Sequence, residues 1–129
     1  MKRNLLTIAS LLSILFGTTH LAQDIVYGYE PGKVSNLILV PIVVVWLYGT
    51  LVLEERLSGY IIILLGSLLS LAVPIVHMSG RGVGVASRMA GSNGHFFFVW
   101  TLIALGVTAL FSVILTVCAL WNLRRGQSR

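Results

Sequence analysis

Four long hydrophobic stretches divide the chain, and polar or charged residues separate them. The stretches cover approximately Leu5–Leu21, Val34–Leu53, Gly59–His77 and Phe96–Trp121. A helix needs about 20 mainly apolar residues to cross a hydrocarbon core of about 30 Å. The pattern therefore predicts an all-α protein, a single domain over residues 1–129 that forms a bundle of four transmembrane helices. Pro41 and Pro74 fall inside the second and third stretches, where neighbouring helices can satisfy the freed carbonyl groups.

The composition also indicates a membrane protein. Of the 129 residues, 57% are hydrophobic and only 10% are charged. Soluble domains contain roughly 25% charged residues, so these few charges cannot cover a surface in water. The net charge is +5, but the basic residues stand at the ends of the spans and form no long run. We therefore expect them to orient the protein in the membrane, and we expect no nucleic-acid partner.

The basic residues predict the orientation. Lys2, Arg3, Arg56, Arg124, Arg125 and Arg129 fall on one side of the four spans, and Lys33, Arg81 and Arg88 fall on the other. Cytoplasmic loops are enriched in Lys and Arg, so we expect a multi-pass plasma-membrane protein with both termini in the cytoplasm. The first stretch also resembles a signal peptide. A cut after Ala22 would place His20 where a small residue is needed, so we expect the stretch to remain as an anchor.

The chain partly matches itself at an offset of 57 residues. Ser10, Ser13 and His20 fall on Ser67, Ser70 and His77. Apolar residues match by chance often, so the polar matches at one fixed offset carry the weight. They favour a tandem duplication of a helical hairpin, which would give two parallel repeats related by an axis along the membrane normal.

The matched residues also lie on one side of each helix. Ser10, Ser13, Gly17 and His20 follow a spacing of three, four and three, and Ser67, Ser70, Pro74 and His77 repeat it. In lipid, small residues mark the places where helices approach closely. We therefore expect both histidines to point into the bundle. Span four has its own small-residue stripe, which we expect to line the same interior: Ala104, Thr108, Ser112 and Thr116.

All three histidines and Asp24 fall at the same, extracytoplasmic ends of the predicted spans. His20 and Asp24 are four residues apart, so one more helical turn would place them on one face. That arrangement suits a carboxylate that orients an imidazole, or two metal ligands. At the repeat-related position after His77 stands Arg81, which could pair with Asp24 instead. The glycine-rich loop 79–94 could cover the cluster as a lid.

Two classes of function are compatible with these residues. In the leading interpretation the histidines are interfacial polar caps, and the protein is a non-enzymatic accessory subunit or a self-associating module, with the bilayer, other membrane subunits or itself as partners. In the alternative, the extracytoplasmic cluster binds a cofactor. His20 and His77 would be axial ligands of a haem, or His20, Asp24, His77 and His95 would hold a divalent metal such as zinc or copper. Such a protein could be an electron carrier or a hydrolase.

Other functions are disfavoured. No Asp, Glu, Lys or Arg lies deep inside a predicted span. Ion-coupled transporters and voltage sensors generally need such a group near the middle of the membrane. Cys118 is the single cysteine and lies within the fourth span, so the chain can form no internal disulfide.

Overall fold

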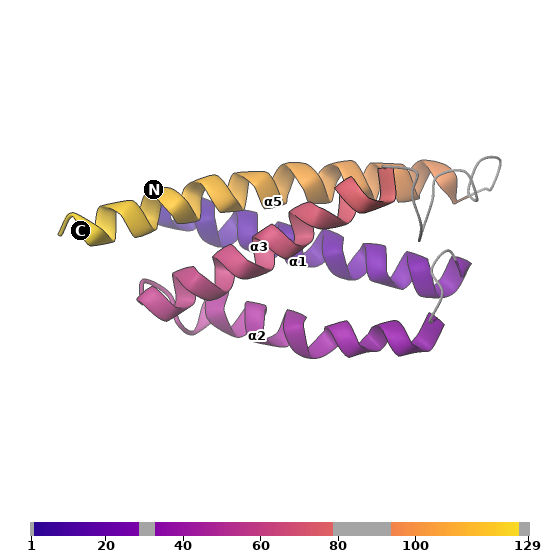
Figure 1. Cartoon of the computed structure of the whole chain (residues 1–129), viewed down its shortest axis with the longest axis horizontal. Helices are drawn as coiled ribbons and strands as arrows, with labels where there is room; N and C mark the ends of the chain where they lie inside the picture. Colours follow the sequence, from indigo (N-terminus) through magenta and orange to yellow (C-terminus); the bar gives the residue numbers. More distant parts are fainter. Residues whose placement is uncertain (1, 29–32, 79–93, 127–129) are drawn as a thin grey trace.

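The computed structural model describes residues 2–28, 33–78 and 94–126 (Figure 1). These residues form four α-helices and a 3-10 helix, with no strand among them: α1 (Lys2–Tyr27), η1 (Lys33–Leu39), α2 (Val40–Leu51), α3 (Leu57–Met78) and α5 (His95–Arg124). The prediction of an all-α protein is confirmed. Three helices are long and apolar enough to cross a membrane: α1 over Asn4–Tyr27, α3 and α5.

The second hydrophobic stretch was predicted to form one continuous helix, and the structure differs from this prediction. It is divided into η1 and α2, and Pro41 stands in the first turn of α2 rather than inside a helix. A proline is well tolerated there, because the first N–H groups of a helix have no partner within it. At the usual rises of 3-10 and α-helices, η1 and α2 together measure about 32 Å. Pro74 does lie inside a helix, as predicted.

The helices run alternately up and down. The start of α1 and the end of α5 lie at one end of the bundle, and the ends of α1 and α3, which carry His20 and His77, lie toward the other (Figure 1). α1 and α3 form the middle of the bundle, and they share little direct interface. α5 packs extensively against both on one side, and η1 and α2 pack against them less extensively on the other.

Hydroxyl groups and small residues hold the interior together. The Trp46 indole donates a hydrogen bond of 2.9 Å to the Ser10 hydroxyl, which lies 2.8 Å from the Thr50 hydroxyl. On the other side of the bundle, Ser67 donates to Ser112 at 2.7 Å. Gly66 lies directly against the Trp46 ring, where a Cβ atom would collide with the indole. Small residues therefore permit close packing, and hydroxyls satisfy one another between helices.

The predicted interior faces of α1 and α3 are confirmed. The buried members of the two stripes are Ser10, Ser13, His20, Ser67, Ser70, Pro74 and His77, and Gly17 is partly buried. The stripe predicted for the fourth span is only half right. Ser112 and Thr116 are fully buried, whereas Ala104 and Thr108 lie at the margin of the interface. The buried face of α5 instead continues through Ala109, Leu105 and Leu102 to Phe98, because an almost uniformly apolar helix gives little contrast between its faces.

Candidate metal centre

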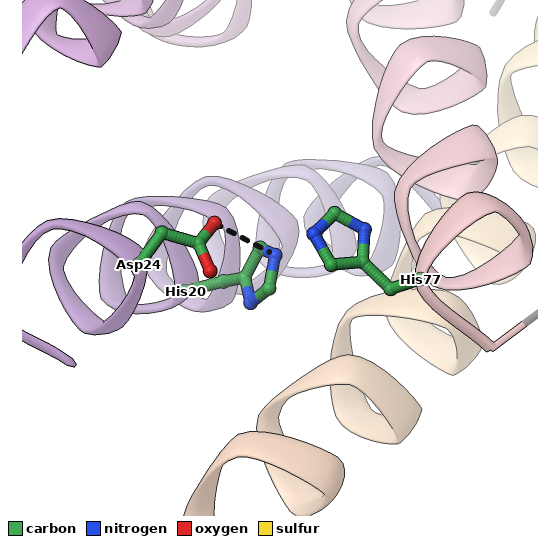
Figure 2. A group of neighbouring side chains, drawn as sticks. All are labelled: His20, Asp24 and His77. Carbon is green, nitrogen blue, oxygen red and sulfur yellow. Dashed lines mark ion pairs between the residues drawn. The ribbon is translucent and has the colours of Figure 1, made fainter. Parts of the chain in front are cut away.

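Three of the four predicted ligands come together in the structure. His20 and Asp24 of α1 and His77 of α3, hereafter the His–Asp cluster, each offer one ligand atom, and these atoms lie within 4.8 Å of one another (Figure 2). The three residues are 4%, 5% and 9% exposed. The cluster is therefore withdrawn from the surface rather than spread across it.

α1 supplies two members of the cluster because it is longer than predicted. The helix continues past Leu21 to Tyr27, so Asp24 stands one turn beyond His20 on the same face. His20 Nε2 and Asp24 Oδ2 are 3.3 Å apart. This is longer than a charge-assisted hydrogen bond of about 2.7–2.9 Å. It equals the edge of a coordination tetrahedron, which is about 3.3 Å when each bond to zinc is about 2.0 Å.

α3 presents His77 in a form that suits metal binding. His77 Nδ1 lies 2.9 Å from the Val73 carbonyl oxygen. A carbonyl can only accept a hydrogen bond, so Nδ1 carries a proton and Nε2 is the ring nitrogen through which a metal could be bound. A backbone carbonyl on the other ring nitrogen is a common way for proteins to fix the tautomer and orientation of a ligating histidine. The two imidazoles meet edge to face, with ring centroids 4.7 Å apart.

His20 is the member with the greatest need of a partner. Its Nδ1 is buried and makes no hydrogen bond within the described part of the chain, and its Nε2 has only the long approach to Asp24. A buried polar atom without a hydrogen bond costs about 1–3 kcal/mol. A cation bound to one ring nitrogen would give that nitrogen a partner.

His95 is not a member of this group of ligand atoms. It is partly buried in the first turn of α5, and its Nδ1 also makes no hydrogen bond to the described residues. The four-ligand site predicted from the sequence is therefore not observed in this form. Arg81, the proposed partner of Asp24, and loop residues 79–93, the proposed lid, lie outside the described residues.

Sequence reasoning missed two residues at the site. Phe98 of α5 is fully buried, and its ring centroid lies 4.8 Å from that of His20 and 5.9 Å from that of His77. It closes the side of the cluster that faces α5. Gln23 stands three residues after His20, and its Oε1 is buried without a hydrogen bond to the described residues. The spacing of His20, Gln23 and Asp24 on one helical face was the available signal for this second residue.

The geometry suits a small ion better than a haem. A porphyrin between two axial imidazoles would have to separate them, whereas His20 and His77 are in contact and Phe98 packs against both. A single ion needs much less rearrangement. Each ligand atom must lie about 2.0–2.2 Å from zinc, and the atoms already approach one another within 4.8 Å.

No family model, curated protein or solved structure matches the chain. The chemistry of the His–Asp cluster is therefore the basis on which a function can be argued.

Proposed function

We propose that this chain is a small plasma-membrane protein that crosses the bilayer four times and holds one divalent transition-metal ion, zinc before copper, between α1 and α3. The observation that carries the proposal is the His–Asp cluster, in which three buried ligand atoms from two helices lie within 4.8 Å of one another. The role is non-enzymatic. The ion joins two helices of a membrane component that works with other membrane subunits or with copies of itself.

The distribution of side chains supports insertion into a bilayer. Large apolar residues are exposed all around the bundle, for example Leu65, Val107 and Phe111 at 55–62%. Hydroxyl-bearing residues such as Ser67 and Ser112 are fully buried instead. This distribution reverses that of a soluble protein, and it is expected where lipid surrounds the helices and small polar residues join them.

Two further features support four spans with cytoplasmic termini. η1 and α2 are together about 32 Å long, enough to cross a hydrocarbon core of about 30 Å. Arg56, directly before α3, and Arg124 and Arg125, at the end of α5, lie at the end of the bundle where α1 begins, and basic residues favour the cytoplasmic side. With this orientation, the His–Asp cluster lies near the extracytoplasmic face.

The ligand set favours zinc. Imidazole nitrogens suit zinc, copper and nickel, whereas magnesium and calcium prefer oxygen ligands alone. Two histidines and a carboxylate are known zinc donors, and water can take the fourth position. Each ligand is at most 9% exposed, which leaves little access for a substrate. This burial is why we propose a structural site rather than a hydrolytic one.

The test is the zinc content of purified protein. The protein is first stripped of metal with a chelator and then dialysed against zinc. We expect about one zinc ion per chain, measured by inductively coupled plasma mass spectrometry. A variant with both His20→Ala and His77→Ala should retain none. If wild-type protein binds no zinc or copper under these conditions, the metal proposal fails and only the role as a membrane component remains.

A further inference from the structure

A groove of about 490 Å³ opens at the end of the bundle opposite the His–Asp cluster. It lies between the beginning of α3 and the end of α5, where the two helices diverge after packing together farther along (Figure 1). Its lining includes Leu57, Ile61, Val117, Leu120, Trp121 and Arg124. All but the last of these are hydrophobic, so the groove is a slot for hydrocarbon with a single guanidinium group in its wall.

More positive than negative charge surrounds the groove. Arg56 is exposed directly before Leu57, the first residue of α3, and Arg125 follows Arg124 at the end of α5. The Arg125 guanidinium lies over the Trp121 ring, 4.8 Å from its centroid. The acidic residues described at this end are Glu54 and Glu55 in the turn before α3. Among the residues that line the groove, Arg124 is the charged one.

We infer that this groove binds one anionic phospholipid of the cytoplasmic leaflet, with an acyl chain along the apolar wall and the phosphate against Arg124. This inference rests on the membrane insertion and orientation proposed above, but it does not depend on the metal site. A guanidinium matches a phosphate with two parallel hydrogen bonds. Basic pockets between transmembrane helices on the cytoplasmic side are suited to anionic headgroups.

An apolar groove with one guanidinium group in its wall fits an anionic phospholipid better than the alternatives. An apolar helix of a second copy could cover Leu57 and Val117, but the acidic residues of its corresponding end, Glu54 and Glu55, stand in the turn before α3 and not on an apolar helix face. A free phosphate would meet Arg124 but leave the apolar wall without a partner. An anionic phospholipid supplies both groups in one molecule, and Trp121 stands at the depth where aromatic rings meet headgroups.

Native mass spectrometry of the purified full chain tests the inference. The protein in detergent is titrated separately with phosphatidylglycerol and with phosphatidylcholine of the same acyl chains. The fraction of protein that carries one lipid is measured at each concentration. We expect wild type to prefer phosphatidylglycerol about fivefold, the contribution of one basic residue near an anionic lipid. Arg124→Gln should remove that preference, and Arg56→Gln, a matched loss of one exposed charge at the edge of the groove but not in its lining, should keep most of it.

A second variant tests the position of the acyl chain. Val117→Trp should fill the groove and lower the affinity for the first bound lipid, whichever of the two lipids is added. Equal binding of the two lipids by wild type, equal losses in Arg124→Gln and Arg56→Gln, or unchanged binding in Val117→Trp would each overturn the inference. Failure of the proposed membrane insertion has a different signature. The chain would then be released from membranes by alkaline carbonate, whereas a membrane-embedded chain without headgroup preference would refute only the lipid site.

Discussion

His20 of α1 and His77 of α3 meet edge to face inside the bundle, with ring centroids 4.7 Å apart and ring planes at 80°. The two helices share little interface elsewhere, because α5 and α2 lie on either side of them. The histidine pair is therefore a place where α1 and α3 touch directly through side chains. A metal ion bound there would join two helices that are otherwise connected mainly through α5.

Asp24→Asn tests whether the Asp24 carboxylate binds the ion directly, as the proposed ligand set requires. An uncharged amide oxygen is a weaker zinc ligand than a carboxylate, so we expect the dissociation constant for zinc to rise by more than about 100-fold, measured by competition with a chromophoric chelator. His77→Ala should abolish measurable binding. A rise of only about 10–100-fold in Asp24→Asn, the range typical of residues that orient a ligating histidine, would show that Asp24 orients His20 and does not bind the ion.

His95→Ala tests whether His95 is a zinc ligand, as the sequence predicted, or lies outside the site, as in the structure. His95 is not within the group formed by His20, Asp24 and His77, so its loss should change zinc affinity less than about twofold, which corresponds to about 0.4 kcal/mol. His20→Ala is the matched change on α1 and should abolish binding. If His95→Ala lost zinc as completely as His20→Ala, the ion would sit nearer the start of α5 than the structure indicates.

Gly66→Ala should destabilise the bundle because a Cβ atom at this position collides with the Trp46 indole. Overpacking of this kind costs about 1–3 kcal/mol, measurable as a lower midpoint of thermal unfolding in detergent. Gly17→Ala is the matched control. Its Cβ would lie 3.8 Å from the nearest atom, Leu105 Cδ1, so we expect no loss of stability. Equal midpoints for wild type and Gly66→Ala would contradict the close packing of α2 on α3.

The orientation can be tested with single cysteines. Cys118 is first replaced by Ala, and cysteine is then introduced at Lys33 or at Arg56. A membrane-impermeant maleimide should label position 33 from outside intact cells and should label position 56 only after lysis. This follows from the larger number of basic residues on the side of Arg56. Labelling of position 56 from outside would place the His–Asp cluster at the cytoplasmic face instead.

The sequence predicted the buried faces of α1 and α3 better than it predicted the arrangement of the other two hydrophobic stretches. Small and hydroxyl-bearing residues at helical spacing identified the buried faces of α1 and α3, and those faces carry His20 and His77. The break between η1 and α2 was not predictable, because apolar content does not show whether Pro41 begins a helix or interrupts one. For α5, the nearly uniform apolar sequence did not show which side of the helix faces the bundle. The side that does carries Phe98 to the histidines, whereas His95 lies outside the cluster.

X-ray absorption at the zinc edge measures the proposed site most directly. For the zinc-loaded wild-type protein, we predict a first shell of nitrogen and oxygen at about 2.0–2.1 Å with outer-shell scattering from two imidazoles. The signal of two imidazoles should be lost in His20→Ala and in His77→Ala and kept in His95→Ala. A wild-type spectrum without imidazole scattering, or one unchanged by loss of either cluster histidine, would contradict metal binding between α1 and α3.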